Sequence, residues 1–141
     1  MYIKLKNGVV DKYPYSLADL VKDNPDTSFP AEISDACAAG FEVYPVILVD
    51  KPQVDHTQTV VEETPNLING SWFQDFTVVD ATAEEIAVRV QQLNAVADSN
   101  RAEAYRNESD PIYFKWQRGE ALYEDWLDKV DEIRARYPKV T

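Results

Sequence analysis

The sequence predicts an α+β protein: a small N-terminal antiparallel β-rich domain with short helices, over residues 1–80, followed by an α-helical domain over residues 81–141. Two Asn-Gly pairs separate strand-like runs in the first part, and this pair favours the tight turn of a β-hairpin. The composition changes at Asp80, after which residues 80–108 contain neither proline nor glycine. Apolar residues then recur at the spacing of one long helix.

The first hairpin is expected over residues 2–13, with its turn at Asn7-Gly8. Pro14 is expected to end the second strand, because proline cannot donate a hydrogen bond to a sheet. The segment after it, "SLADLVKDNP", predicts a short helix. Ser16 would cap its first turn and Pro25 would stop it.

Between this helix and the second hairpin, "SFPAEISDACAAG" predicts one or two further helical turns that Gly40 closes. The segment "FEVYPVILVD" then reads as extended chain. Its Pro45 suggests a strand at the edge of the sheet.

A second hairpin is expected around Asn69-Gly70, between the Val- and Thr-rich run at 54–64 and the strand "SWFQDFTVV". The two-residue period of a strand places Trp72 and Phe76 on one face and Phe73 on the other. Both faces therefore carry an aromatic ring. Either one ring points away from the main core, or the strand is covered on both sides.

Thr82 and Glu85 form a capping box at the start of a helix expected over residues 82–108, about 40 Å long. Its apolar residues follow a heptad-like spacing of four, three and four, at Ile86, Val90, Leu93 and Ala97. The small β-rich part cannot cover so long a stripe. We therefore expect contact with another helix, from the same chain or from a second copy.

Asp110-Pro111 is expected to start the next helix, which Gly119 ends, and a last helix is expected over residues 121–136. One interpretation of the aromatic residues here is a small local core, formed by Tyr113, Trp116, Leu122 and Trp126. The alternative is a docking surface, because Trp and Tyr commonly anchor protein interfaces. We assign Tyr113 and Trp116, with Trp72, Phe73 and Phe76, as candidate partner-binding residues.

The chemistry-bearing residues favour a non-catalytic protein with no cofactor and no metal. His56 and Cys37 are the only residues of their types, which leaves too few for a typical zinc site and none for an intrachain disulfide. The four glycines are isolated, so no phosphate-binding loop is present. Carboxylate pairs such as Glu62-Glu63 and Glu84-Glu85 have structural explanations at a strand end and in a first helical turn.

The formal net charge of −11 argues against nucleic acid and anionic membranes as partners. No apolar run approaches the roughly 20 residues of a membrane span. The first residues also lack the apolar segment of a signal peptide, so we expect the chain in the cytoplasm of the cell that makes it.

Several motifs resemble small proteins encoded beside tail-fibre genes in tailed bacteriophages. They are "YPYS" at 13–16, "DNPDTSFP" at 23–30, "VYPV" at 43–46, "NGSW" at 69–72, "AEE" at 83–85, "SDPIYFKWQRGE" at 109–120 and "WLDKVDEIRARYP" at 126–138. The resemblance is to the phage tail-fibre assembly chaperones and tail assembly proteins. None of these motifs is a catalytic signature.

The resemblance implies a chaperone that binds tail-fibre chains and assists their folding and trimeric assembly in the cytoplasm of the infected host, with a place in the virion tail if it stays bound. It implies self-association as a trimer that matches the fibre. We expect the helical part, with Ile86, Val90, Leu93 and Ala97, to self-associate as a coiled coil, and the β-rich part to hold the fibre. The reverse assignment remains open.

Three other functions also remain open at this stage. The chain can be a permanent component of the phage tail or baseplate, a small hydrolase that uses His56, or an acidic inhibitor that mimics nucleic acid. A fixed copy number in purified particles would support the structural component. Loss of function in a His56→Ala variant would support the hydrolase, and salt-sensitive binding to a basic host protein would support the inhibitor.

Overall fold

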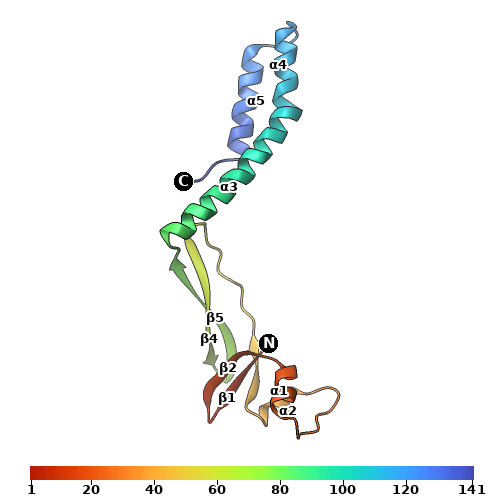
Figure 1. The fold of residues 1–141 in the computed structure, drawn as a ribbon, viewed down its shortest axis with the longest axis vertical. Coiled ribbons are helices and arrows are strands. Elements are labelled where there is room, and N and C mark those ends of the chain that lie inside the picture. The colour runs from red at the N-terminus through yellow and green to blue at the C-terminus, as the bar shows by residue number, and fades with distance from the viewer. The chain divides into compact units, whose positions relative to one another are not determined.

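The computed structural model describes all residues from 1 to 141, which divide into two compact units, Met1–Asp80 and Ala81–Thr141. Unit 1 contains a five-stranded sheet with two short helices, and unit 2 is helical. The fold is therefore α+β, as the sequence predicts. Figure 1 shows the elements of each unit, which are described separately below.

Unit 1 forms one sheet in the order β2-β1-β3-β5-β4. Its strands are β1 (Tyr2–Lys6), β2 (Val9–Tyr15), β3 (Val43–Ile47), β4 (Gln58–Ile68) and β5 (Ser71–Asp80). Neighbouring strands are antiparallel at three of the four pairings, and β3 and β5 are parallel. The reason is the connection: residues 48–57 carry the chain on from β3 before it reverses into β4, so that β5 returns in the direction of β3 (Figure 1).

Both hairpin turns form at the Asn-Gly pairs, as predicted. Asn7 and Gly8 have φ values of 54° and 78°, and Asn69 and Gly70 have 49° and 81°. Two consecutive positive φ values are the signature of a type I′ turn, which suits the twist of the flanking strands. The first turn is also held from outside, because the Glu42 carboxylate accepts hydrogen bonds from the backbone N–H groups of Asn7 and Gly8 at 3.1 and 3.0 Å.

Two expectations about proline are wrong. Strand β2 continues through Pro14 to Tyr15, which pairs with Tyr2; β2 lies at an edge of the sheet, where a missing donor is tolerated. Strand β3 is central, although it contains Pro45. Its residues up to Pro45 pair with β1 and its last two pair with β5, so Pro45 lies where one ladder gives way to the other.

Unit 1 has two hydrophobic clusters. In the first, α1 (Leu17–Asp23) and α2 (Asp35–Ala39) lie against the sheet, and the buried residues are Tyr15, Leu20, Ala38 and Val43. The second belongs to the sheet itself and is built on Ile3, Leu5 and Val46, with Trp72 and Tyr13 among the residues packed on it. Register places Ile3 opposite Tyr44 and Val46 opposite Trp72, so this cluster occupies one face of the sheet.

The helix caps of unit 1 agree only in part with the sequence. Ser16 caps α1, as expected, and the structure adds a capping box with Asp19. Gly40 ends α2, but its backbone stays right-handed at φ −60°. The left-handed residue that reverses the chain is Glu42, at φ 57°, whose carboxylate is the group that holds the first hairpin turn.

Unit 2 begins with α3 (Ala83–Ala104), which the predicted Thr82–Glu85 capping box starts. The chain continues through one π-helical turn (Tyr105–Ser109) into α4 (Asp110–Gln117), so one joined helix of 35 residues replaces the two predicted ones. Gly119, at φ 75°, then reverses the chain into α5 (Tyr123–Arg136).

The π turn explains why Asp110-Pro111 does not start a new helix. The Asp110 N–H donates to the Tyr105 carbonyl, five residues back, and the Ser109 hydroxyl donates to the same oxygen at 3.2 Å. One wider turn shifts the hydrogen-bond register just before Pro111, which has no N–H and would crowd the carbonyl four residues back. The helix therefore passes through the proline.

The helix α5 packs antiparallel against the C-terminal half of the joined helix (Figure 1). Ile133 is fully buried, and the small residues Ala97, Ala104 and Ser109 are the buried residues of the long helix. The chain end continues along α3, where the Asn94 side chain exchanges two hydrogen bonds with the Val140 backbone at 3.0 and 2.9 Å.

Candidate protein-binding surfaces

Four rings from α4 and α5 form a closed aromatic cluster around the Gly119 turn, namely Tyr113, Trp116, Tyr123 and Trp126. Tyr113 lies 5.5 Å from Trp116 and 5.2 Å from Trp126, between ring centroids. Tyr123 completes the cluster at 4.9 Å from Trp116 and 5.3 Å from Trp126. The planes are tilted or edge-on, which is the favourable geometry for aromatic pairs. This cluster fixes the end of the helical hairpin.

Three of the four residues expected in a local core, Tyr113, Trp116 and Trp126, therefore contact one another, although Trp116 is exposed. Leu122 is wrong: its side chain is 65% exposed, and Tyr123 takes the place expected of it. The sequence contained the signal, because Tyr123 extends the stripe of Trp126, Val130, Ile133 and Tyr137 by one helical turn at a spacing of three.

The cluster is not sealed from solvent. Trp116 is 37% and Phe114 is 54% exposed, and Phe114 also contacts Tyr113 at 5.9 Å between ring centroids. Together with the exposed side chains of Leu122, Tyr123 and Leu127, they form an apolar surface that we call the aromatic tip. Tyr113 lies inside the cluster and Trp116 at its surface, so of the two residues assigned to a partner it is Trp116 that presents its ring. Sequence reasoning missed Phe114 as a member.

The predicted stripe of α3 is divided into two parts by the rest of unit 2. Ala97 is buried at the end where α5 and the chain end pack, while Ile86 and Val90 are half-buried and Leu93 is 46% exposed. Polar contacts mark the covered part: Arg101 donates to the carbonyls of Tyr137 and Arg134, and Lys139 pairs with Asp98 at 2.7 Å. The first three turns of α3 have no covering helix within unit 2.

The predicted aromatic residues of β5 lie on different faces of the sheet. Trp72 faces the cluster of Ile3, Leu5 and Val46, and Phe76 lies on the same face, opposite Glu62. Phe73 lies on the other face, beside Ile47 in the parallel register. All three rings are half-buried. Trp72 therefore contributes to the core of unit 1, and Phe73 is the ring that points away from it.

The Phe73 face of the β4–β5 hairpin carries exposed apolar side chains on either side of a polar pair, Asn66 and Asp75. By register this face carries Ile47, Val61, Ile68 and Val79, all of which are exposed. Neither α1 nor α2 covers it, because these helices pack on the cluster of Tyr15, Leu20, Ala38 and Val43. We call this surface the hairpin face.

Strands β2 and β4 are the two edges of the sheet, and a polar network connects them. The Tyr13 hydroxyl donates to the Glu62 carboxylate, and the Gln74 amide donates to the same carboxylate oxygen at 2.9 Å. Desolvation by burial and the Glu62 contact raise the pKa of Tyr13 to about 12. The hydrogen bonds from Tyr13 and Gln74 lower the pKa of Glu62 below its ordinary value. At neutral pH the donor is thus protonated and the acceptor ionised.

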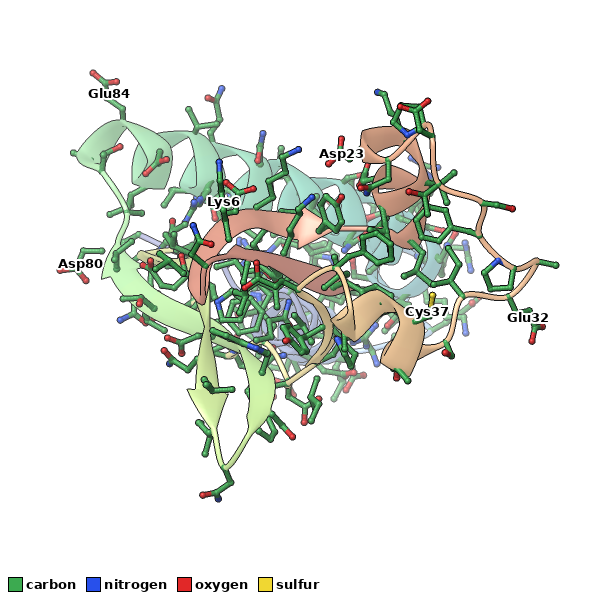
Figure 2. The ribbon with its side chains drawn as sticks, turned by 90° about the horizontal axis from the view of Figure 1, so that it is seen from below. Lys6, Asp23, Glu32, Cys37, Asp80 and Glu84 are labelled. Atoms are coloured by element: carbon green, nitrogen blue, oxygen red, sulfur yellow. The ribbon has the colours of Figure 1, made fainter.

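The single cysteine and the single histidine are not members of the aromatic tip or the hairpin face. Cys37 is a half-buried free thiol on α2 (Figure 2), and His56 lies in the turn before β4. No group of three or more His, Cys, Asp or Glu side chains is arranged to hold a metal ion. No helix has the length and apolar composition that a membrane crossing requires.

Comparison with known proteins adds no relative: no family model, curated protein or solved structure matches the chain.

Proposed function

We propose that this chain is a phage-encoded assembly chaperone that binds tail-fibre chains and assists their folding into trimers without catalysing a reaction. The observation that carries the proposal is the apolar surface left open on both units, the aromatic tip and the hairpin face. Exposed Phe114 and Trp116 are residues of the kind that anchor interfaces. The motifs that resemble tail-fibre assembly chaperones supply the class of client.

The proposed client explains why such surfaces would be useful. Fibre chains intertwine as trimers and expose apolar faces and strand edges until assembly is complete. A chaperone that covers these surfaces reduces off-pathway contacts and raises the yield of trimer. Its net charge of −11 would keep the complex in solution by repulsion between complexes. The place of action would be the cytoplasm of the infected bacterium.

We assign fibre binding to unit 1 through the hairpin face around Phe73, and self-association to unit 2. The uncovered part of α3, with Ile86, Val90 and Leu93, would form a coiled coil between copies. One chaperone per fibre chain would give a three-fold arrangement. In the reverse assignment, the aromatic tip would hold the fibre.

Co-expression with the tail-fibre chain of the phage that encodes it tests the proposal. We expect more soluble trimeric fibre with the chaperone than without it, and a complex that contains both chains. If the fibre yield is unchanged and the chains do not co-purify, the proposal is wrong.

A permanent component of the phage tail or baseplate is the second candidate, since exposed side chains such as Phe114 and Leu122 would suit a lasting neighbour. Quantitative mass spectrometry of purified particles separates the two. A fixed copy number per tail supports the structural role, and absence from particles supports the chaperone.

A further inference from the structure

The two edge strands of unit 1 are separated by a groove of about 510 Å³. Its lining comes from β2 and β4 alone and consists of Val10, Asp11, Tyr13, Pro14, Glu62, Glu63 and Thr64. A volume of this size is typical of ligand-binding clefts. The groove belongs to unit 1 and does not include the hairpin face.

Each wall of the groove is an edge strand of the sheet. Strand β2 pairs only with β1, and β4 pairs only with β5, so neither pairs its other side with any strand. The outer N–H and C=O groups of such edges can pair with an added strand. Pro14 and Pro65 interrupt the two edges, which leaves residues 9–13 and 60–63 as the stretches suited to pairing.

The backbones of the two edges are not paired with each other. The two edges meet through the ends of two long side chains, the Tyr13 hydroxyl and the Glu62 carboxylate, and not through backbone hydrogen bonds. Their backbones are therefore farther apart than the ~4.8 Å of paired strands. A strand between two edges needs about twice that spacing, or ~10 Å. An inserted strand would lie beside the Tyr13–Glu62 contact or displace it.

The negative charge of the groove favours a positively charged binding partner. Asp11, Glu62 and Glu63 line it, and no Lys or Arg does. A segment with Lys or Arg side chains would complement these carboxylates, and an acidic one would be repelled. Another copy of this chain, with a net charge of −11, is a poor electrostatic match.

We propose that the β2–β4 groove binds an extended, Lys- or Arg-bearing segment of a partner protein, which adds a strand between the two edges. Strand β2 and strand β4 run in opposite directions, as the chain of pairings from β2 to β4 requires. The inserted segment is therefore parallel to one edge and antiparallel to the other. This inference rests on the proposed function only in that the chain binds another protein; the partner need not be a fibre.

The test uses the full chain and two blocked octapeptides, one of alternating Val and Lys and one of alternating Val and Glu. Binding is followed by calorimetry and by NMR amide hydrogen exchange. We expect the Val–Lys peptide to bind and to slow exchange at residues 9–13 and 60–63, on both walls. The Val–Glu peptide should not bind. Binding of both peptides alike, binding of neither, or protection on only one wall overturns the proposal.

Charge reversal supplies the matched control. The variant Asp11→Lys/Glu63→Lys should bind the Val–Lys peptide about tenfold more weakly, because two ion pairs become repulsive. The variant Asp26→Lys/Glu32→Lys makes the same change of charge in the α1–α2 loop, where Glu32 points away from the sheet (Figure 2), and should bind like the wild type. Equal loss in both variants contradicts a specific groove. Equal thermal melts without peptide show that both variants fold.

Two outcomes separate this inference from the proposed function. If the groove variant still co-purifies with the fibre chain and peptide binding fails, the inference falls and the chaperone proposal stands. If the peptide binds as expected and no fibre chain co-purifies, the chaperone proposal falls and the groove remains. Protection of both walls in the chain alone, with a dimeric mass, would assign the groove to a second copy and overturn the proposal.

Discussion

Single residues connect parts of unit 1 that are distant in the sequence. Tyr13 and Glu62 lie on opposite edge strands, yet one hydrogen bond joins them, and Gln74 binds the same carboxylate. The other side chain with this role is Glu42, which reaches the first hairpin turn. Glu62 and Glu42 each accept hydrogen bonds from donors that would otherwise bind water. For Glu62, whose hydrogen bonds lower its pKa, this contribution should depend on ionisation.

The Tyr13→Phe variant tests this dependence. It removes the donor to Glu62 and should destabilise the chain by about 1 kcal/mol at neutral pH, the net value of an ordinary hydrogen bond. The pKa of Glu62 is lowered in the folded state, so this stability is present above the ordinary carboxyl pKa and is lost as the pH falls through the folded value. The pKa of Tyr13 is raised to about 12, so the stability is present below pH 10 and is lost as the pH rises towards 12.

Urea unfolding of wild type and variant across the pH range measures this difference. The difference in unfolding free energy between wild type and variant should be largest near pH 7 and should disappear at acid and at alkaline pH. A gap that is independent of pH would mean that the Tyr13 ring matters through packing alone.

At the scale of the elements, α5 determines the structure of unit 2. It packs on the joined helix at the level of Ala97, Ala104 and the π turn, and Arg136 extends two guanidinium hydrogen bonds of 2.7 and 2.9 Å to Glu108 in that turn. The aromatic cluster fixes its other end. Ile133, at 0% exposure, is the apolar anchor between these polar and aromatic contacts.

Truncation of Ile133 should therefore destabilise unit 2 strongly. Ile133→Ala is expected to cost about 2–5 kcal/mol, because it leaves a cavity at a fully buried site. Leu122→Ala removes a side chain of the same size from an exposed position and should change stability by less than about 0.5 kcal/mol. Thermal unfolding followed by circular dichroism at 222 nm compares the two. Similar losses would show that α5 is not held by its buried face.

The elements also show what a sequence can predict. The Asn-Gly turns and the capping boxes at Ser16 and Thr82 were predictable because each depends on residues within one turn of chain. Pro45 and Pro111 misled because their consequences depend on distant partners or on a change of helical register. The order β2-β1-β3-β5-β4 leaves no local pattern, so neither the central place of β3 nor the β2–β4 groove could be inferred. The sequence predicts which side chains of β5 share a face of the sheet. It does not predict which of the two faces packs on the core.

At the scale of the whole molecule, both compact units keep apolar surface open while the total charge is strongly negative. Our proposal that the chain binds other proteins rests on this combination. Unit 2 offers the first turns of α3 and the aromatic tip, and unit 1 offers the hairpin face and the groove. Each surface predicts a distinct consequence of mutation.

Self-association is tested at Leu93. If α3 forms a coiled coil between copies, Leu93→Asp places a charge in the apolar contact and should dissociate the trimer to monomers. Ala95→Asp introduces the same charge two residues away, off the stripe, and should leave the assembly intact. Sedimentation equilibrium of the three proteins gives the mass. A monomeric wild type, or equal dissociation by both substitutions, contradicts the assignment of α3.

The central proposal is that the open apolar surfaces hold another chain. Its most direct test is native mass spectrometry of this chain produced together with the fibre chain. We predict a complex that contains fibre trimer and this chain, and its loss when Phe73 and Trp116 are both replaced by Ser in a chain that still folds. The proposal is contradicted if this chain is found only unbound and the yield of fibre trimer is the same for the wild type, for the doubly substituted chain and in the absence of the chain.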